Sequence, residues 1–221
     1  MKKIISMLLA ITLMLGLSGC SILGNVWGNK KTLYSDYVTS LLDSRYIGKF
    51  DKYIELTGMS LSDAQAEYEA DMKAEAASLL YYWSLEETDT AVDTILPVYK
   101  KLAKNASYEV LSAEYENGTY KITVAIYPYD LMEQLEITYE LFGAERERAR
   151  ENGEFDEMSE EEFNAFYQEQ GLEYLIQAIE NSKTASTAIE RTVTIIETVE
   201  LVSVSDAELG DLYRIVLGII D

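Results

Sequence analysis

The chain has 221 residues, a formal net charge of −21, no histidine and a single cysteine, Cys20. This composition excludes a Ser-His-Asp triad, a Cys-His pair, an internal disulfide and the usual zinc or copper sites. The negative charge disfavours nucleic acid and anionic surfaces as partners and favours a basic or neutral one. Catalysis would have to use carboxylates, tyrosine, lysine, arginine or an oxygen-ligated ion. We expect no enzyme activity, no cofactor and no metal.

The first twenty residues are typical of an exported lipoprotein. Lys2 and Lys3 precede an apolar run over residues 4–17, which is too short for a mature membrane span because a span takes about 20 residues. The run ends in Leu17-Ser18-Gly19-Cys20, which resembles the lipobox of bacterial lipoproteins. We therefore predict a signal peptide over residues 1–19 and an anchor of diacylglyceryl and palmitate chains on Cys20, at the extracytoplasmic face of the cell membrane.

The remainder of the chain divides by composition into a tether and a folded part. Residues 20–31 are rich in glycine and asparagine and are predicted to be a flexible tether. Residues 32–221 show no repeat and no Pro-rich or low-complexity stretch. We expect them to form a single domain.

Apolar residues at three- and four-residue steps predict helices in the first part of the folded region. The first has its stripe over residues 34–46, and a short turn follows over residues 50–56. A longer helix begins near Ser60, with core positions at Leu61, Ala64, Tyr68, Met72, Ala76, Leu79 and Trp83. A helix from Thr88 or Asp89 to about residue 104 should kink or restart at Pro97, which lacks a backbone donor.

The sharpest structural signal is a hairpin over residues 108–127. Asn117-Gly118 predicts a two-residue type I′ turn between strands of alternating polarity. With that turn fixed, Glu114 faces Lys121, which is a complementary pair. The same register places Leu111 opposite Val124 and Glu109 opposite Ile126, which leaves Glu109 as an exception on the apolar face.

Further helices and strands are predicted after the hairpin. One helix begins near Asp130, and a capping box at Ser159 starts another, which Gly171 weakens or splits. The acidic loop over residues 151–162 lacks the ligand spacing of an EF-hand, so we do not expect a calcium site there. The β-branched residues 191–204 form one long or bulged strand or two short ones, and Ser205 caps a last helix. The order predicts an α+β fold with N-terminal helices and an antiparallel sheet of three or four strands.

The lipobox, the helical stretch from Tyr34 to Leu85 and the strand ending Val124-Ala125-Ile126-Tyr127-Pro128 together resemble an uncharacterised family of Gram-positive lipoproteins. The resemblance implies helices followed by a curved sheet, similar to cystatin-like or nuclear-transport-factor-like folds. Such folds often hold a pocket between sheet and helix. The resemblance supplies no catalytic or binding residues.

Three functions remain open. The first is a membrane-anchored binding or adaptor module for a protein, peptide or small ligand, favoured by export, the tether, the charge and the 17 tyrosines. The second is a carboxylate-dependent hydrolase of envelope glycan, for which Glu109 and Asp130 are the candidate pair, with Tyr127 and Tyr129 nearby in the sequence. These four residues are also the candidate ligand-binding residues of the first function. The third is a structural envelope protein.

Overall fold

The computed structural model describes residues 30–198 and 202–219. The predicted signal peptide, Cys20 and most of the predicted tether lie outside the described residues. The chain packs as two compact units, each built from separate stretches of sequence. Among the described residues, the first unit combines 30–71 with 103–129, 184–198 and 202–219, and the second combines 72–102 with 130–183. A single domain over residues 32–221 stays a prediction.

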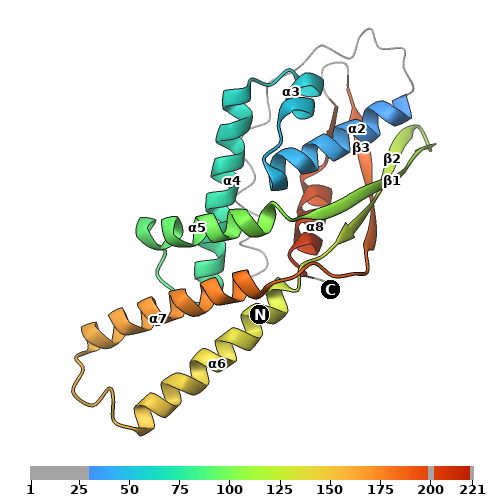
Figure 1. Ribbon diagram of the computed structural model, residues 1–221. Coiled ribbons are helices and arrows are strands. Elements are labelled where there is room, and N and C mark those ends of the chain that lie inside the picture. Colours follow the sequence, from blue (N-terminus) through green and yellow to red (C-terminus); the bar gives the residue numbers. More distant parts are fainter. Residues whose placement is uncertain (1–29, 199–201, 220–221) are drawn as a thin grey trace. The chain divides into compact units, whose positions relative to one another are not determined.

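The first unit contains a curved antiparallel sheet of four strands (Figure 1). Its strands follow the order β1 (Ser107–Glu116), β2 (Thr119–Tyr127), β3 (Ile189–Glu197) and β4 (Val202–Val204). Of the two forms predicted for the β-branched segment, the structure has the pair of strands, β3 and β4. The predicted α+β fold with helices on a curved sheet is confirmed.

The N-terminal helices of this unit are α2 (Lys30–Leu42), which continues as the π-helical turn η2 (Asp43–Ile47), and α3 (Asp51–Thr57). Because α2 begins at Lys30, the last two residues of the predicted tether are helical. The last helix is α8 (Asp206–Val216). The predicted stripe of the first helix is buried: Tyr34, Tyr37, Val38, Leu41, Leu42 and Tyr46.

Both α2 and α8 pack on the same face of the sheet. Tyr34 of α2 meets the ring of Tyr120 edge-on, with 4.8 Å between centroids. On α8, Asp211 accepts a hydrogen bond from Arg191 of β3 at 3.2 Å. Tyr120 pairs with Ile195, and Arg191 lies four residues before Ile195 on the same strand, so both contacts lie on one face.

The hairpin register is as predicted close to the turn and wrong beyond it. Glu114 pairs with Lys121, but the ladder then shifts between Val110 and Ser112 at a β-bulge. The extra residue places Val110, and not Leu111, opposite Val124, and it moves Glu109 opposite Ala125. Glu109 therefore leaves the apolar face, because one inserted residue reverses the side on which each preceding side chain lies.

The second unit is helical. It comprises the C-terminal part of α4 (Leu61–Tyr82), α5 (Asp89–Ala103), α6 (Leu131–Glu151) and α7 (Glu160–Asn181). Trp83 is fully buried, with the ring of Phe142 stacked 6.3 Å away and that of Tyr139 edge-on at 5.5 Å. The capping box of Ser159 and Glu162 is present as predicted.

The helices correct three details of the sequence analysis. The helix α5 runs through Pro97 without a restart, so of the two forms predicted there the kink stays a prediction, and α7 runs through Gly171 without a split. In both helices the surrounding tertiary packing outweighs the local preference. Leu61, predicted as a core position, is 47% exposed because it occupies the first turn of α4.

Candidate functional site: a groove beside the edge strand

A groove of about 560 Å³ runs between α2 and β1 in the first unit. Its helix wall is formed by Lys31, Thr32, Ser35 and Thr39, and its sheet wall by β1 from Tyr108 to Ala113. Because β1 ends the strand order, it has a neighbouring strand on one side only within the described residues. The groove therefore follows a free edge of the sheet.

The sequence of α2 explains why its groove side is polar. The hydroxyl residues Thr32, Ser35 and Thr39 are three and four positions apart, so they share one face of the helix. The buried stripe through Tyr34 and Val38 occupies a different face and docks on the sheet. The helix thus packs with its apolar side and leaves a row of hydroxyls beside β1.

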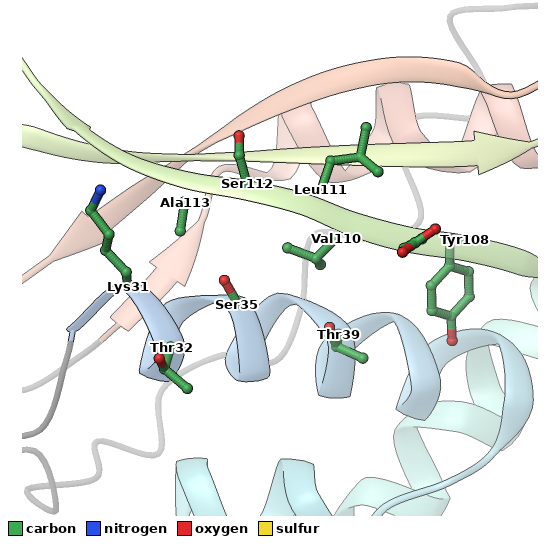
Figure 2. Close-up of a pocket in the computed structure, with 10 residues that line it drawn as sticks. Lys31, Thr32, Ser35, Thr39, Tyr108, Val110, Leu111, Ser112 and Ala113 are labelled. Atoms are coloured by element: carbon green, nitrogen blue, oxygen red, sulfur yellow. The ribbon is translucent and has the colours of Figure 1, made fainter.

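Figure 2 shows the groove from the side, with α2 below β1. Lys31 and Ser35 point from the helix toward the strand, and Val110 and Ala113 point from the strand toward the helix. Leu111 and Ser112 point away from α2. The bulge therefore places Val110, and not Leu111, against the helix.

A tyrosine cluster closes one end of the groove. The Tyr108 hydroxyl donates a hydrogen bond of 2.5 Å to the Asp43 carboxylate, which ties β1 to the end of α2. The Tyr46 ring lies 6.4 Å from the Tyr108 ring and stacks on Tyr213 of α8 at 6.2 Å. Burial, and then the hydrogen bond to Asp43, raises the pKa of Tyr108 far above its ordinary value, so the hydroxyl keeps its proton and its hydrogen bond to Asp43 at physiological pH.

The free edge of β1 carries negative charge. The strand contains Glu109, Glu114 and Glu116 and no lysine or arginine. Lys121 of β2 forms an ion pair with Glu116 at 2.5 Å, and not with Glu114, the residue directly opposite. Among the described residues, Glu109 and Glu114 have no ion-pair partner, and both are exposed. Two carboxylates are therefore available along the edge.

The structure does not gather the four candidate residues into one site. Glu109 lines the groove and is exposed. Tyr127 is half-buried opposite Ser107 at the far end of β2. Tyr129 is buried, its backbone N–H donates to the carbonyl of Val216 at 2.8 Å, and burial raises the pKa of its hydroxyl. Neither tyrosine is among the residues that line the groove.

Asp130 has a structural role that differs from the predicted one. It occupies the N-cap position of α6, but its carboxylate makes no capping hydrogen bond. Instead, Oδ1 accepts a hydrogen bond of 2.6 Å from the backbone N–H of Lys183, and Oδ2 accepts one of 3.3 Å from the side chain of Gln134. The carboxylate joins the start of α6 to the segment after α7.

The described residues contain no cluster of three or more carboxylates and thiols with the geometry of a metal site. Within the described ranges, no helix has both the length and the apolar character of a membrane span.

Sequence reasoning missed the helix wall of the groove. The signal was present as the hydroxyl spacing of Thr32, Ser35 and Thr39, on the side of the helix away from the apolar stripe. A row of hydroxyls is also common on a solvated helix, so it becomes informative only when β1 is known to lie beside it. That placement depends on the packing of α2 against β1, which are distant in sequence.

Comparison with known proteins gives a fold relationship and no family. No family model matches the chain, and no curated protein matches it either. The fold is similar to the crystal structure of a putative lipoprotein, ycdA, from Bacillus subtilis, with a TM-score of 0.59 and 15% sequence identity. The match covers 84% of this chain and 57% of ycdA, so this chain corresponds to little more than half of that protein. The shared fold is compatible with the Gram-positive lipoprotein family suggested by the sequence.

Proposed function

We propose that the chain is an extracytoplasmic lipoprotein, anchored through Cys20, whose folded part is a binding or adaptor module. The lipobox supports the anchor, and the fold shared with ycdA is compatible with it. The binding function rests on one observation, the open groove between α2 and the free edge of β1. The edge offers backbone donors and acceptors, and the helix wall offers hydroxyls, so the groove suits a polar ligand.

Metabolic labelling with palmitate tests the anchor. We expect label on the wild type and on Ser21→Ala, and none on Cys20→Ala, which should also accumulate as the uncleaved precursor. Ser21→Ala is the control because it changes the residue next to Cys20 without removing the thiol. An unlabelled wild-type protein, or one recovered in the aqueous phase after detergent partition, contradicts the anchor.

Site-specific photo-crosslinking in intact cells tests the binding function. A photoreactive amino acid at Ser35, on the groove wall, should give a defined crosslinked product. The same amino acid at Tyr81, which is 54% exposed in the second unit, is the control. Equal products at both positions, or none at Ser35, would argue against the groove as the binding surface.

We propose no hydrolysis through Glu109 and Asp130. A glycosidase pair needs one carboxyl in a desolvated setting that keeps it protonated, next to a second carboxyl. Glu109 is exposed, and both oxygens of Asp130 accept hydrogen bonds from Lys183 and Gln134. We therefore assign Glu109 and Asp130 no catalytic role and propose ligand binding as the function of the groove.

A further inference from the structure

We propose that the groove binds an extended, basic peptide segment, which adds as a strand to the free edge of β1. The proposal rests on the binding function proposed above and names the class of ligand. Within the described part of the chain, the groove combines three properties: a strand edge that pairs with no other strand, a hydroxyl-lined helix beside that edge, and two carboxylates along the edge without ion-pair partners.

The backbone of β1 sets the conformation of the ligand. The turn at Asn117-Gly118 makes Glu116 and Thr119 a hydrogen-bonded pair. Hydrogen-bonded and non-hydrogen-bonded pairs alternate along an antiparallel ladder, so the backbone groups of Tyr115 and Ala113 face away from β2. Only another extended backbone matches such a row of donors and acceptors, and strand addition is a recurrent mode of peptide recognition.

The helix wall sets the side chains that fit. Lys31, Ser35 and Thr39 line one side of the groove along six residues of β1, from Tyr108 to Ala113, a length of roughly 20 Å at the rise of a strand. In an added strand, alternate side chains point toward α2 and away from it. The inward ones meet the hydroxyls of Ser35 and Thr39 and the side chain of Lys31, and are therefore small or polar and uncharged.

Charge selects a basic ligand over a second copy of the chain. The free edge carries Glu109 and Glu114 without ion-pair partners among the described residues, and no base. A second copy would bring the same glutamates to the junction, and charged residues on an edge strand are a recognised protection against such self-pairing. Lysine or arginine on the outward side of an incoming strand would pair with both carboxylates.

The bulge narrows the choice of register. The extra residue at Leu111 breaks the repeat of backbone groups between Val110 and Ser112. An incoming strand can match the edge groups on both sides of the bulge only in registers that skip Leu111. The groove therefore holds a peptide in few alignments.

Fluorescence anisotropy with the full-length lipidated protein in detergent micelles tests the proposal. The probe is a labelled octapeptide of alternating lysine with threonine or serine, measured at 0.15 M salt. Two further probes are matched to it: one has glutamate in place of lysine, and the other keeps the lysines but carries N-methyl groups on alternate backbone amides. We expect the basic peptide to bind, the acidic one not to bind, and N-methylation to weaken binding about tenfold or more, because it removes backbone donors.

Two variants locate the binding. Ala113→Pro removes an outward N–H without removing a ladder bond to β2, and it should weaken the basic peptide about tenfold. The double variant Glu109→Gln, Glu114→Gln should weaken it roughly threefold to tenfold. The control Glu140→Gln, Glu180→Gln changes the net charge equally at two exposed positions of the second unit and should leave the affinity unchanged. Because the charge variants preserve the backbone, they test the proposal even if Ala113→Pro fails to fold.

Each other outcome overturns the proposal. Equal affinity for the basic peptide and its N-methylated form means electrostatic adhesion without strand addition. If the basic peptide does not bind, basic peptides are excluded as the ligand class. If the protein has twice its monomer mass in solution and Ala113→Pro restores the monomer mass, the edge of β1 pairs with a second copy of the chain. None of these outcomes alters palmitate labelling or crosslinking at Ser35, so they are distinct from failure of the proposed function.

Discussion

Gly171 is a glycine in the middle of a helix whose small size is needed by a neighbouring side chain, Leu85. It lies in the interior of α7, where glycine is about 1 kcal/mol less favourable than alanine. A Cβ at this position would lie 2.6 Å from Cδ2 of Leu85, which is buried. Glycine is therefore needed here for the close approach of Leu85, which is why the helix tolerates it.

We predict that Gly171→Ala lowers the free energy of unfolding by about 1 kcal/mol, because crowding of Leu85 costs about 1–3 kcal/mol and outweighs the gain in helix propensity. In a Leu85→Ala background the same change should instead raise it, by up to about 1 kcal/mol. Urea denaturation of the four proteins in a double-mutant cycle measures both effects. An equal effect in the two backgrounds would exclude the contact as the cause.

The hairpin marks the limit of what polarity in the sequence predicts. Alternation predicts the register from the turn to Ala113 correctly, since each strand has one polar and one apolar side there. Beyond that point Leu111 and Val110 are both apolar, so the sequence does not show which of the two side chains lies on the apolar face of the sheet. The only sign of a bulge in the sequence is Glu109, which a regular ladder would place on the apolar face. The edge position of β1, and hence the groove, depends on the pairing of β2 with β3, which local sequence does not encode.

We predict that the pairing of β1 with β2 depends neither on the side chain of Leu111 nor on its presence, because the ladder skips this residue. Leu111→Ser should change the free energy of unfolding by less than about 1 kcal/mol, because the side chain is 47% exposed. Deletion of Leu111 removes the bulge and joins Val110 directly to Ser112, which keeps Val110 opposite Val124 and Glu109 opposite Ala125. The deletion should therefore also change the free energy of unfolding by about 1 kcal/mol or less. Urea denaturation of both variants checks this, and a loss of more than about 3 kcal/mol on deletion would contradict the register.

Buried tyrosines govern the response of the molecule to alkali. Burial, with a hydrogen bond to Glu197, raises the pKa of Tyr34 to about 12. Burial also raises the pKa of Tyr37, Tyr108 and Tyr129. In each case the unfolded tyrosine ionises near its ordinary pKa of about 10, before the folded one. The stabilisation is therefore complete below pH 10 and is lost as the pH rises toward the folded pKa.

We predict a steep loss of stability between pH 10 and 12, to which Tyr34 alone contributes up to roughly 2–3 kcal/mol. Each ionised tyrosine also adds to a net charge of −21. Urea denaturation at pH 8, 10.5 and 11.5 measures the loss. Tyr34→Phe should reduce the pH dependence by the share of Tyr34, and Tyr81→Phe, at an exposed position, should leave it unchanged. A flat profile in the wild type would contradict the prediction.

The start of α2 has a mechanical consequence for the proposed anchor at Cys20. Lys30 lies ten residues after Cys20, a reach of at most about 36 Å, so tension on the anchor enters the fold at the first turn of the helix. There the Lys30 ammonium holds both oxygens of Glu197 on β3, at 2.7 and 3.0 Å, and Tyr34 rests on Tyr120. These contacts bear the load first. Because α2 is also the wall of the groove, a pull on the anchor acts directly on the surface that would hold a ligand.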